Sequence, residues 1–60
     1  MTLYDELFEI HDLLVADDCE RTLENYCAQS AFSSRMVRRE LERLCEEGEF
    51  VKRDNEYRVF

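Results

Sequence analysis

At the centre of the sequence stands Phe32-Ser-Ser-Arg-Met-Val-Arg-Arg-Glu-Leu-Glu-Arg-Leu-Cys-Glu-Glu-Gly48, a segment typical of one amphipathic helix. Ser33 is a favourable N-cap residue, and Gly48 supplies a stop signal at the other end. Between them, apolar residues recur at helical spacing: Val37, Leu41, Leu44 and Cys45. We therefore predict a helix over about residues 33–47, with Phe32 entering the core just before it.

The first turn and a half of this helix carries a cluster of cations: Arg35, Arg38 and Arg39. Positive charge there opposes the positive end of the helix dipole. Arg35 also has no acidic residue three or four positions away to compensate it. A simpler explanation of the arginines is a solvated helix face with ion pairs four residues apart. Two such pairs fit the sequence: Arg38–Glu42 and Arg43–Glu47. The pattern as a whole is unfavourable for stability but suited to binding an anion at the free N–H groups of the helix.

The composition fits one small globular domain over residues 1–60, with 45% hydrophobic and 38% charged residues. No apolar run approaches the roughly 18 residues that a membrane span needs, so we expect no membrane partner. The first residues lack the basic and apolar regions of a secretory signal. We expect a cytoplasmic protein.

The charge is unevenly distributed along the chain. The net charge is −7, which disfavours general affinity for nucleic acids. Residues 1–30 hold eight acids and one base, whereas residues 31–60 hold seven of each. The bases of the second half cluster at residues 35–43 and 52–58, so a two-sided molecule is predicted.

Three cysteines, Cys19, Cys27 and Cys45, are present without a C-x-x-C pair. We interpret them as reduced, partly buried thiols, because free cysteine commonly behaves as a small hydrophobic residue. Their spacing with the lone His11 fits no familiar metal site, and His11 is better explained as a packing residue. No cofactor, metal or catalytic constellation is expected, and the chain is too short to enclose an ordinary substrate pocket. We expect no enzyme.

Two shorter helices are predicted before the central one. The first spans residues 3–15, with Thr2 as its cap and an apolar stripe at Leu3, Leu7, Ile10 and Leu14. The other side of this helix carries four acids: Asp5, Glu6, Glu9 and Asp12. They are most simply explained as a solvated face, and contact with a protein partner is the alternative. The second helix spans about residues 23–29 and begins after Thr22. The connector at 16–21 is polar and could pair briefly as an edge strand.

A β-hairpin is predicted after Gly48, where the apolar period changes from helical spacing to alternation. Residues 50–53 and 56–60 flank Asp54-Asn55, a two-residue turn. The resulting cross-strand pairs are Arg53 with Glu56, Lys52 with Tyr57, Val51 with Arg58 and Phe50 with Val59. Phe50, Tyr57 and Val59 are then expected to close the core.

This order of elements is that of a winged helix-turn-helix. Residues 22–53, about half of the chain, also resemble the DNA-binding module of DeoR-type and GntR-type bacterial regulators. In those families a Thr-capped helix leads to a segment Ser-x-x-x-Val/Ile-Arg-Arg-x-Leu-x-x-Leu-x-x-x-Gly. The matching residues here are Ser33, Val37, Arg38, Arg39, Leu41, Leu44 and Gly48. The resemblance implies an α+β, mainly α fold: three helices and a C-terminal β-hairpin wing over residues 50–60.

The same resemblance implies a DNA interface made of Ser33, Ser34, Arg35, Arg38, Arg39, Lys52, Arg53 and Arg58. In this interface the two serines bond phosphates, and Arg35 and Arg39 reach guanine edges in the major groove. Arg38 is expected to contact a phosphate. The hairpin cations are expected to contact the DNA backbone.

Two functions are therefore open. The first is a small DNA-binding transcriptional regulator of the kind found in phages, plasmids and accessory loci, with double-stranded DNA as its partner. A homodimer would strengthen its binding, through apolar surface residues such as Tyr4, Phe8 or Met36. The alternative is a winged-helix adaptor or inhibitor whose acidic first helix engages a basic protein or mimics DNA.

Overall fold

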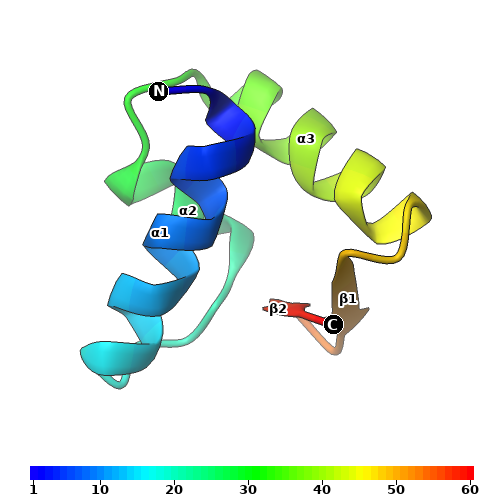
Figure 1. Ribbon diagram of the computed structural model, residues 1–60. Helices are drawn as coiled ribbons and strands as arrows, with labels where there is room; N and C mark the ends of the chain where they lie inside the picture. Colours follow the sequence, from blue (N-terminus) through cyan, green and yellow to red (C-terminus); the bar gives the residue numbers. More distant parts are fainter.

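The computed structural model describes residues 1–60 and contains three helices followed by a two-stranded antiparallel hairpin (Figure 1). The elements are α1 (Leu3–Ala16), α2 (Leu23–Gln29), α3 (Ser34–Glu46), β1 (Phe50–Arg53) and β2 (Glu56–Val59). In Figure 1, α3 runs away from the loop after α2, and its C-terminal end lies next to the hairpin. This is the predicted α+β fold, mainly α, with the element order of a winged helix-turn-helix.

Each helix begins at the hydroxyl residue that the sequence indicates. The side-chain oxygens of Thr2, Thr22 and Ser33 accept hydrogen bonds from backbone N–H groups three residues later, at 3.2, 3.2 and 3.3 Å. α3 ends at Glu46 with Glu47 as its C-cap, and the next residue, Gly48, has a φ of +81° in the left-handed region that favours glycine. The predicted caps and the stop signal are confirmed.

The core consists of nine buried residues that come from all the elements: Leu7, Ile10, Leu14, Tyr26, Val37, Leu41, Leu44, Phe50 and Tyr57. The ring of Phe50 packs against rings of both α1 and α2. Its centroid is 5.0 Å from the Phe8 ring, 6.2 Å from His11 and 6.4 Å from Tyr26. His11 therefore packs against the core, as predicted, and Phe32 is partly buried against the same cluster.

The hairpin has the predicted turn and all four predicted cross-strand pairs. Phe50 and Tyr57 are 1% and 5% exposed, as expected for residues that close the core. The prediction for Val59 was wrong, because its side chain is 43% exposed. Val59 is the last residue of β2, beyond the edge of the core, and its backbone N–H faces Nε2 of His11 at 3.5 Å.

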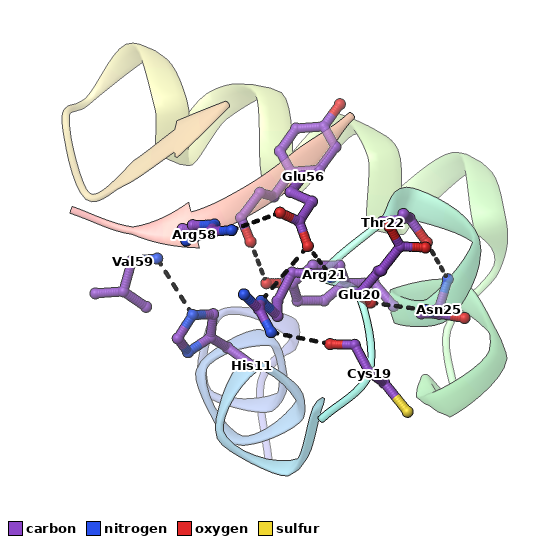
Figure 2. Close-up of polar contacts among 11 residues, drawn as sticks. His11, Cys19, Glu20, Arg21, Thr22, Asn25, Glu56, Arg58 and Val59 are labelled. Atoms are coloured by element: carbon purple, nitrogen blue, oxygen red, sulfur yellow. Dashed lines mark hydrogen bonds and ion pairs between the residues drawn. The ribbon is translucent and has the colours of Figure 1, made fainter. Parts of the chain in front are cut away.

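The hairpin is tied to the segment between α1 and α2 by a carboxylate (Figure 2). Glu56 accepts a hydrogen bond from the backbone N–H of Arg21 at 3.1 Å and another from Nη2 of Arg58 at 2.6 Å. The N–H of Tyr57 donates to the carbonyl of Arg21 at 2.8 Å. Of the connector over residues 16–21, which was expected to pair as an edge strand, only Arg21 bonds the hairpin backbone; the bridge itself joins Thr22, the next residue, to Glu56. An isolated hairpin is marginal in water, so these bonds help to fix it on the helices.

The stability of the fold should depend on the charge of Glu56. The hydrogen bond from Arg58 and then that from the Arg21 backbone hold the pKa of Glu56 below its usual 4.5. The ionised Glu56 carboxylate therefore stabilises the fold at pH values above its pKa in the unfolded chain. This stabilisation is lost as the pH falls through the lower pKa that Glu56 has in the folded chain. Urea denaturation should show Glu56→Gln to be less stable than wild type at pH 7, with the gap closing below about pH 4.

Glu20→Gln is the matched control, because the side chain of Glu20 is exposed and makes no hydrogen bond or ion pair. It should follow the wild-type pH profile. A gap between wild type and Glu56→Gln that stays constant down to acid pH would contradict the assigned role.

Candidate nucleic-acid interface

The N-terminal half of α3 carries three exposed guanidinium groups without an acidic partner. Arg35, Arg38 and Arg39 all lie on the surface, and none of them belongs to any ion pair of the structure. The ion pair between Arg38 and Glu42 that the simpler explanation offers does not form. No carboxylate therefore compensates the cluster, which lies at the end of the helix where the dipole is also positive.

The fourth arginine of α3 is in a different situation. Arg43 contacts Glu40 at 2.6 Å and Glu47 at 2.5 Å, and the second of these pairs was predicted. These hydrogen bonds raise the pKa of Arg43, and the bond from Arg43 lowers the pKa of Glu40. The charge of Arg43 is thus compensated within the helix, whereas the charges of the three earlier arginines are not.

Ser33 and Ser34 are exposed beside these arginines. The Ser33 oxygen accepts the capping bond from Met36, which leaves the hydroxyl hydrogen free to donate. The first N–H groups of a helix have no partner inside it. Serine hydroxyls, free N–H groups and guanidinium groups are therefore gathered at one end of α3, an arrangement that can bind phosphate oxygens.

The cations of the hairpin are not gathered in the same way. Nζ of Lys52 lies 5.5 Å from the centre of the Tyr57 ring, in a shallow hollow that it shares with Glu42 and Glu46 of α3. Arg53 and Arg58 instead line a hollow with Val51, Val59 and Phe60. Of these three cations only Arg58 is paired, with Glu56 at 2.6 Å. The three hairpin residues predicted to contact DNA therefore lie in two different hollows: Lys52 in one, and Arg53 and Arg58 in the other.

A carboxylate of α1 fixes the turn that precedes α3, a role that the sequence analysis missed. Glu6 accepts hydrogen bonds from the Ser30 hydroxyl and from the N–H of Ala31, the latter at 3.2 Å. The Ser30 oxygen in turn accepts a bond from the N–H of Phe32 at 3.0 Å. The prediction that Glu6 belongs to a solvated face was wrong. Glu6 instead fixes the loop that leads into the arginine-bearing end of α3.

The His, Cys, Asp and Glu side chains do not form a metal site. No group of three or more His, Cys, Asp or Glu side chains is placed to hold a metal ion. The three cysteines are free thiols; Cys27 and Cys45 are partly buried, whereas Cys19 is exposed, against our expectation for it. Burial raises the pKa of Cys45. None of the three helices is both long and apolar enough to cross a bilayer.

Comparison with family models, with curated proteins and with solved structures finds no match for this chain.

The side chain of Arg35 is expected to lower the free energy of unfolding. Replacing Arg35 with alanine removes a cation from the positive end of α3 and introduces the best helix-forming residue. We expect Arg35→Ala to raise the free energy of unfolding by about 0.3–1 kcal/mol in urea denaturation at low salt. The matched change Arg43→Ala should lower it, because Arg43 bonds two carboxylates. Equal losses in both variants would mean that Arg35 is structural.

Glu6 should hold the turn before α3 in place. Glu6→Ala removes a charged acceptor from two donors, which typically costs roughly 1–3 kcal/mol of stability. Hydrogen exchange should accelerate most at the backbone amides of Ala31 and Phe32. Glu9→Ala, at an exposed position of the same helix, should change the stability by less than about 0.5 kcal/mol. Unchanged exchange in Glu6→Ala would contradict this role.

Proposed function

We propose that this chain is a small DNA-binding regulator that docks on duplex DNA through the N-terminal end of α3. One observation carries the proposal: three arginines at this end are left without carboxylate partners. Of the other arginines, Arg21, Arg43 and Arg58 each contact a glutamate, and only Arg53 of the hairpin is also without a carboxylate partner. A cationic cluster that opposes the helix dipole is better suited to binding an external anion than to supporting the fold.

The positions around the helix suggest how the cluster divides its contacts. Arg35 and Arg39 lie opposite the buried stripe of Val37, Leu41 and Leu44, which directs them toward base edges in the major groove. Arg38 lies on the flank of that stripe and suits a phosphate. Ser33, Ser34 and the free N–H groups of the first turn complete the contacts to the DNA backbone.

Docking by the end of the helix also accommodates the acids of α3. Glu42 and Glu46 are exposed, and they follow the arginines on the same outward side. They would repel phosphates if α3 lay along its whole length in the groove. Entry by the first turns keeps these acids away from the DNA, as the N-terminal residues of recognition helices do in helix-turn-helix proteins.

A chain of this size covers few phosphates and carries a net charge of −7. The proposed binding is therefore of modest affinity and strongly salt-dependent, by nearly one log unit per phosphate contact per log unit of salt. The proposal includes action in the cytoplasm as a transcriptional regulator, of the kind that phages, plasmids and accessory loci carry.

The acidic face of α1 favours a second candidate function. Asp5, Glu9 and Asp12 are exposed, and no lysine or arginine pairs with them. Such a row could engage a basic protein surface or imitate the charge of DNA. In this alternative the chain is an adaptor or inhibitor, and the arginines of α3 have no anionic target.

Fluorescence anisotropy with a short labelled DNA duplex at low salt separates the two functions. Wild type should bind, and Arg35→Ala/Arg39→Ala should lose about ten- to a hundredfold in affinity, with a salt slope smaller by up to about 2. Arg43→Ala removes one charge from the same helix, but that charge is already compensated. It should bind within a few-fold of wild type.

Equal, negligible binding by all three proteins would remove the DNA-binding proposal. Retention of poly-lysine by wild type and its loss in Glu9→Lys/Asp12→Lys would then support the adaptor. Equal binding of DNA by wild type and the double variant would show that the cluster is not the interface.

A further inference from the structure

We propose that the face where α1 meets the hairpin is covered by a second copy of this chain, in a dimer with two-fold symmetry. This inference goes beyond the proposed function and does not depend on it. It rests on an exposed apolar surface and on the opposite charges at its two sides.

Large apolar side chains are exposed on this face. Tyr4 is 37% exposed, Val59 43% and Phe60 86%. The Phe8 ring is half-buried and lies 5.0 Å from that of Tyr4. Contiguous exposed apolar surface of this kind is typical of interaction sites when it extends over several hundred Å².

These side chains belong to one continuous surface because Glu49 connects its two parts. The carboxylate of Glu49 accepts a hydrogen bond from the Tyr4 hydroxyl on α1. Its backbone carbonyl accepts a bond from the N–H of Phe60 at 3.0 Å. Val59 meets α1 at His11, as described above. The apolar flank of α1 and the end of the hairpin therefore adjoin.

Two hollows flank this junction, and they carry opposite charge. The hollow on α1 measures about 540 Å³ and is lined by Met1, Tyr4, Asp5, Phe8 and Glu9. The hollow on the hairpin measures about 250 Å³ and is lined by Val51, Arg53, Arg58, Val59 and Phe60. The charged side chains of the α1 hollow are the acids Asp5 and Glu9. Those of the hairpin hollow are basic: Arg53 has no carboxylate partner, whereas Arg58 is bonded to Glu56.

A surface with these two halves is complementary to itself. In a two-fold dimer the same patch meets its copy, so the acidic half of one protomer can lie against the basic half of its partner, and the reverse. The charges then attract at both ends of the interface. Phe60 is the natural anchor, because it is an exposed aromatic side chain able to pack on the Tyr4 and Phe8 rings in the open hollow of the partner.

The dimer is expected to be weak and reversible. A standard interface buries roughly 800 Å² on each partner, about a fifth of the 4236 Å² of accessible surface here. The arginines of α3 line neither hollow, so both copies would keep them available. The inference assigns Arg53 and Arg58 to the dimer in place of the DNA contacts that the family resemblance implies.

Sedimentation equilibrium over a range of protein concentrations tests the inference. Wild type should form a reversible dimer, and Phe60→Ser should weaken it by at least about tenfold. Met36→Ser is the control, because Met36 is 46% exposed but lines a different hollow, with Leu3, Arg39, Glu40 and Arg43. It should leave the dimer unchanged. Circular dichroism should show that all variants are folded.

Charge reversal tests the two-fold arrangement itself. Arg53→Glu should weaken the dimer, and adding Glu9→Arg in the same chain should restore it, because both interfacial contacts are then reversed together. A wild type that remains monomeric at roughly millimolar concentration would overturn the proposal. So would a dimer that Phe60→Ser leaves intact, or one that the double charge reversal does not restore.

Discussion

The burial of Phe50 is the packing interaction on which this small domain depends. Phe50 is the first residue of the hairpin, and its ring contacts aromatic side chains of α1 and α2. These contacts anchor the hairpin in the core. Only nine of the 60 residues are buried, so the net stability of the fold is expected to be a few kcal/mol. In such a domain an unfavourable charge arrangement worth about 0.3–1 kcal/mol is a considerable fraction of the total. The unpaired arginines of α3 therefore call for a functional explanation.

The carboxylates that are bonded have distinct structural roles. Glu6 holds the turn before α3, Glu56 connects the hairpin to the α1–α2 segment, and Glu40 and Glu47 compensate Arg43. None of these acids reaches the N-terminal arginines of α3. The division between compensated and uncompensated cations is thus a property of the whole fold rather than of one helix.

Local patterns were sufficient to predict most of the fold. The caps at Thr2, Thr22 and Ser33, the apolar stripes and the alternation after Gly48 set the helix bounds to within a residue or two and the hairpin register without error. The bonds from Glu6 to the Ser30 turn and from Glu56 to Arg21 could not be predicted, because these partners lie 24 to 35 residues away and depend on how the elements pack. The exposure of Val59 has the same origin: alternation identifies a face, but not where the core ends.

The lack of acids three or four positions away predicted a free guanidinium group for Arg35 only, and the structure adds that Arg38 and Arg39 also have no acidic partner. Whether these arginines contact DNA can be measured directly by NMR titration of isotope-labelled protein with a DNA duplex. The account predicts that the largest shifts fall on the backbone and guanidinium resonances of Arg35, Arg38 and Arg39, while Arg43 changes little. Absence of shifts at these arginines, or shifts confined to the acidic face of α1, would contradict it.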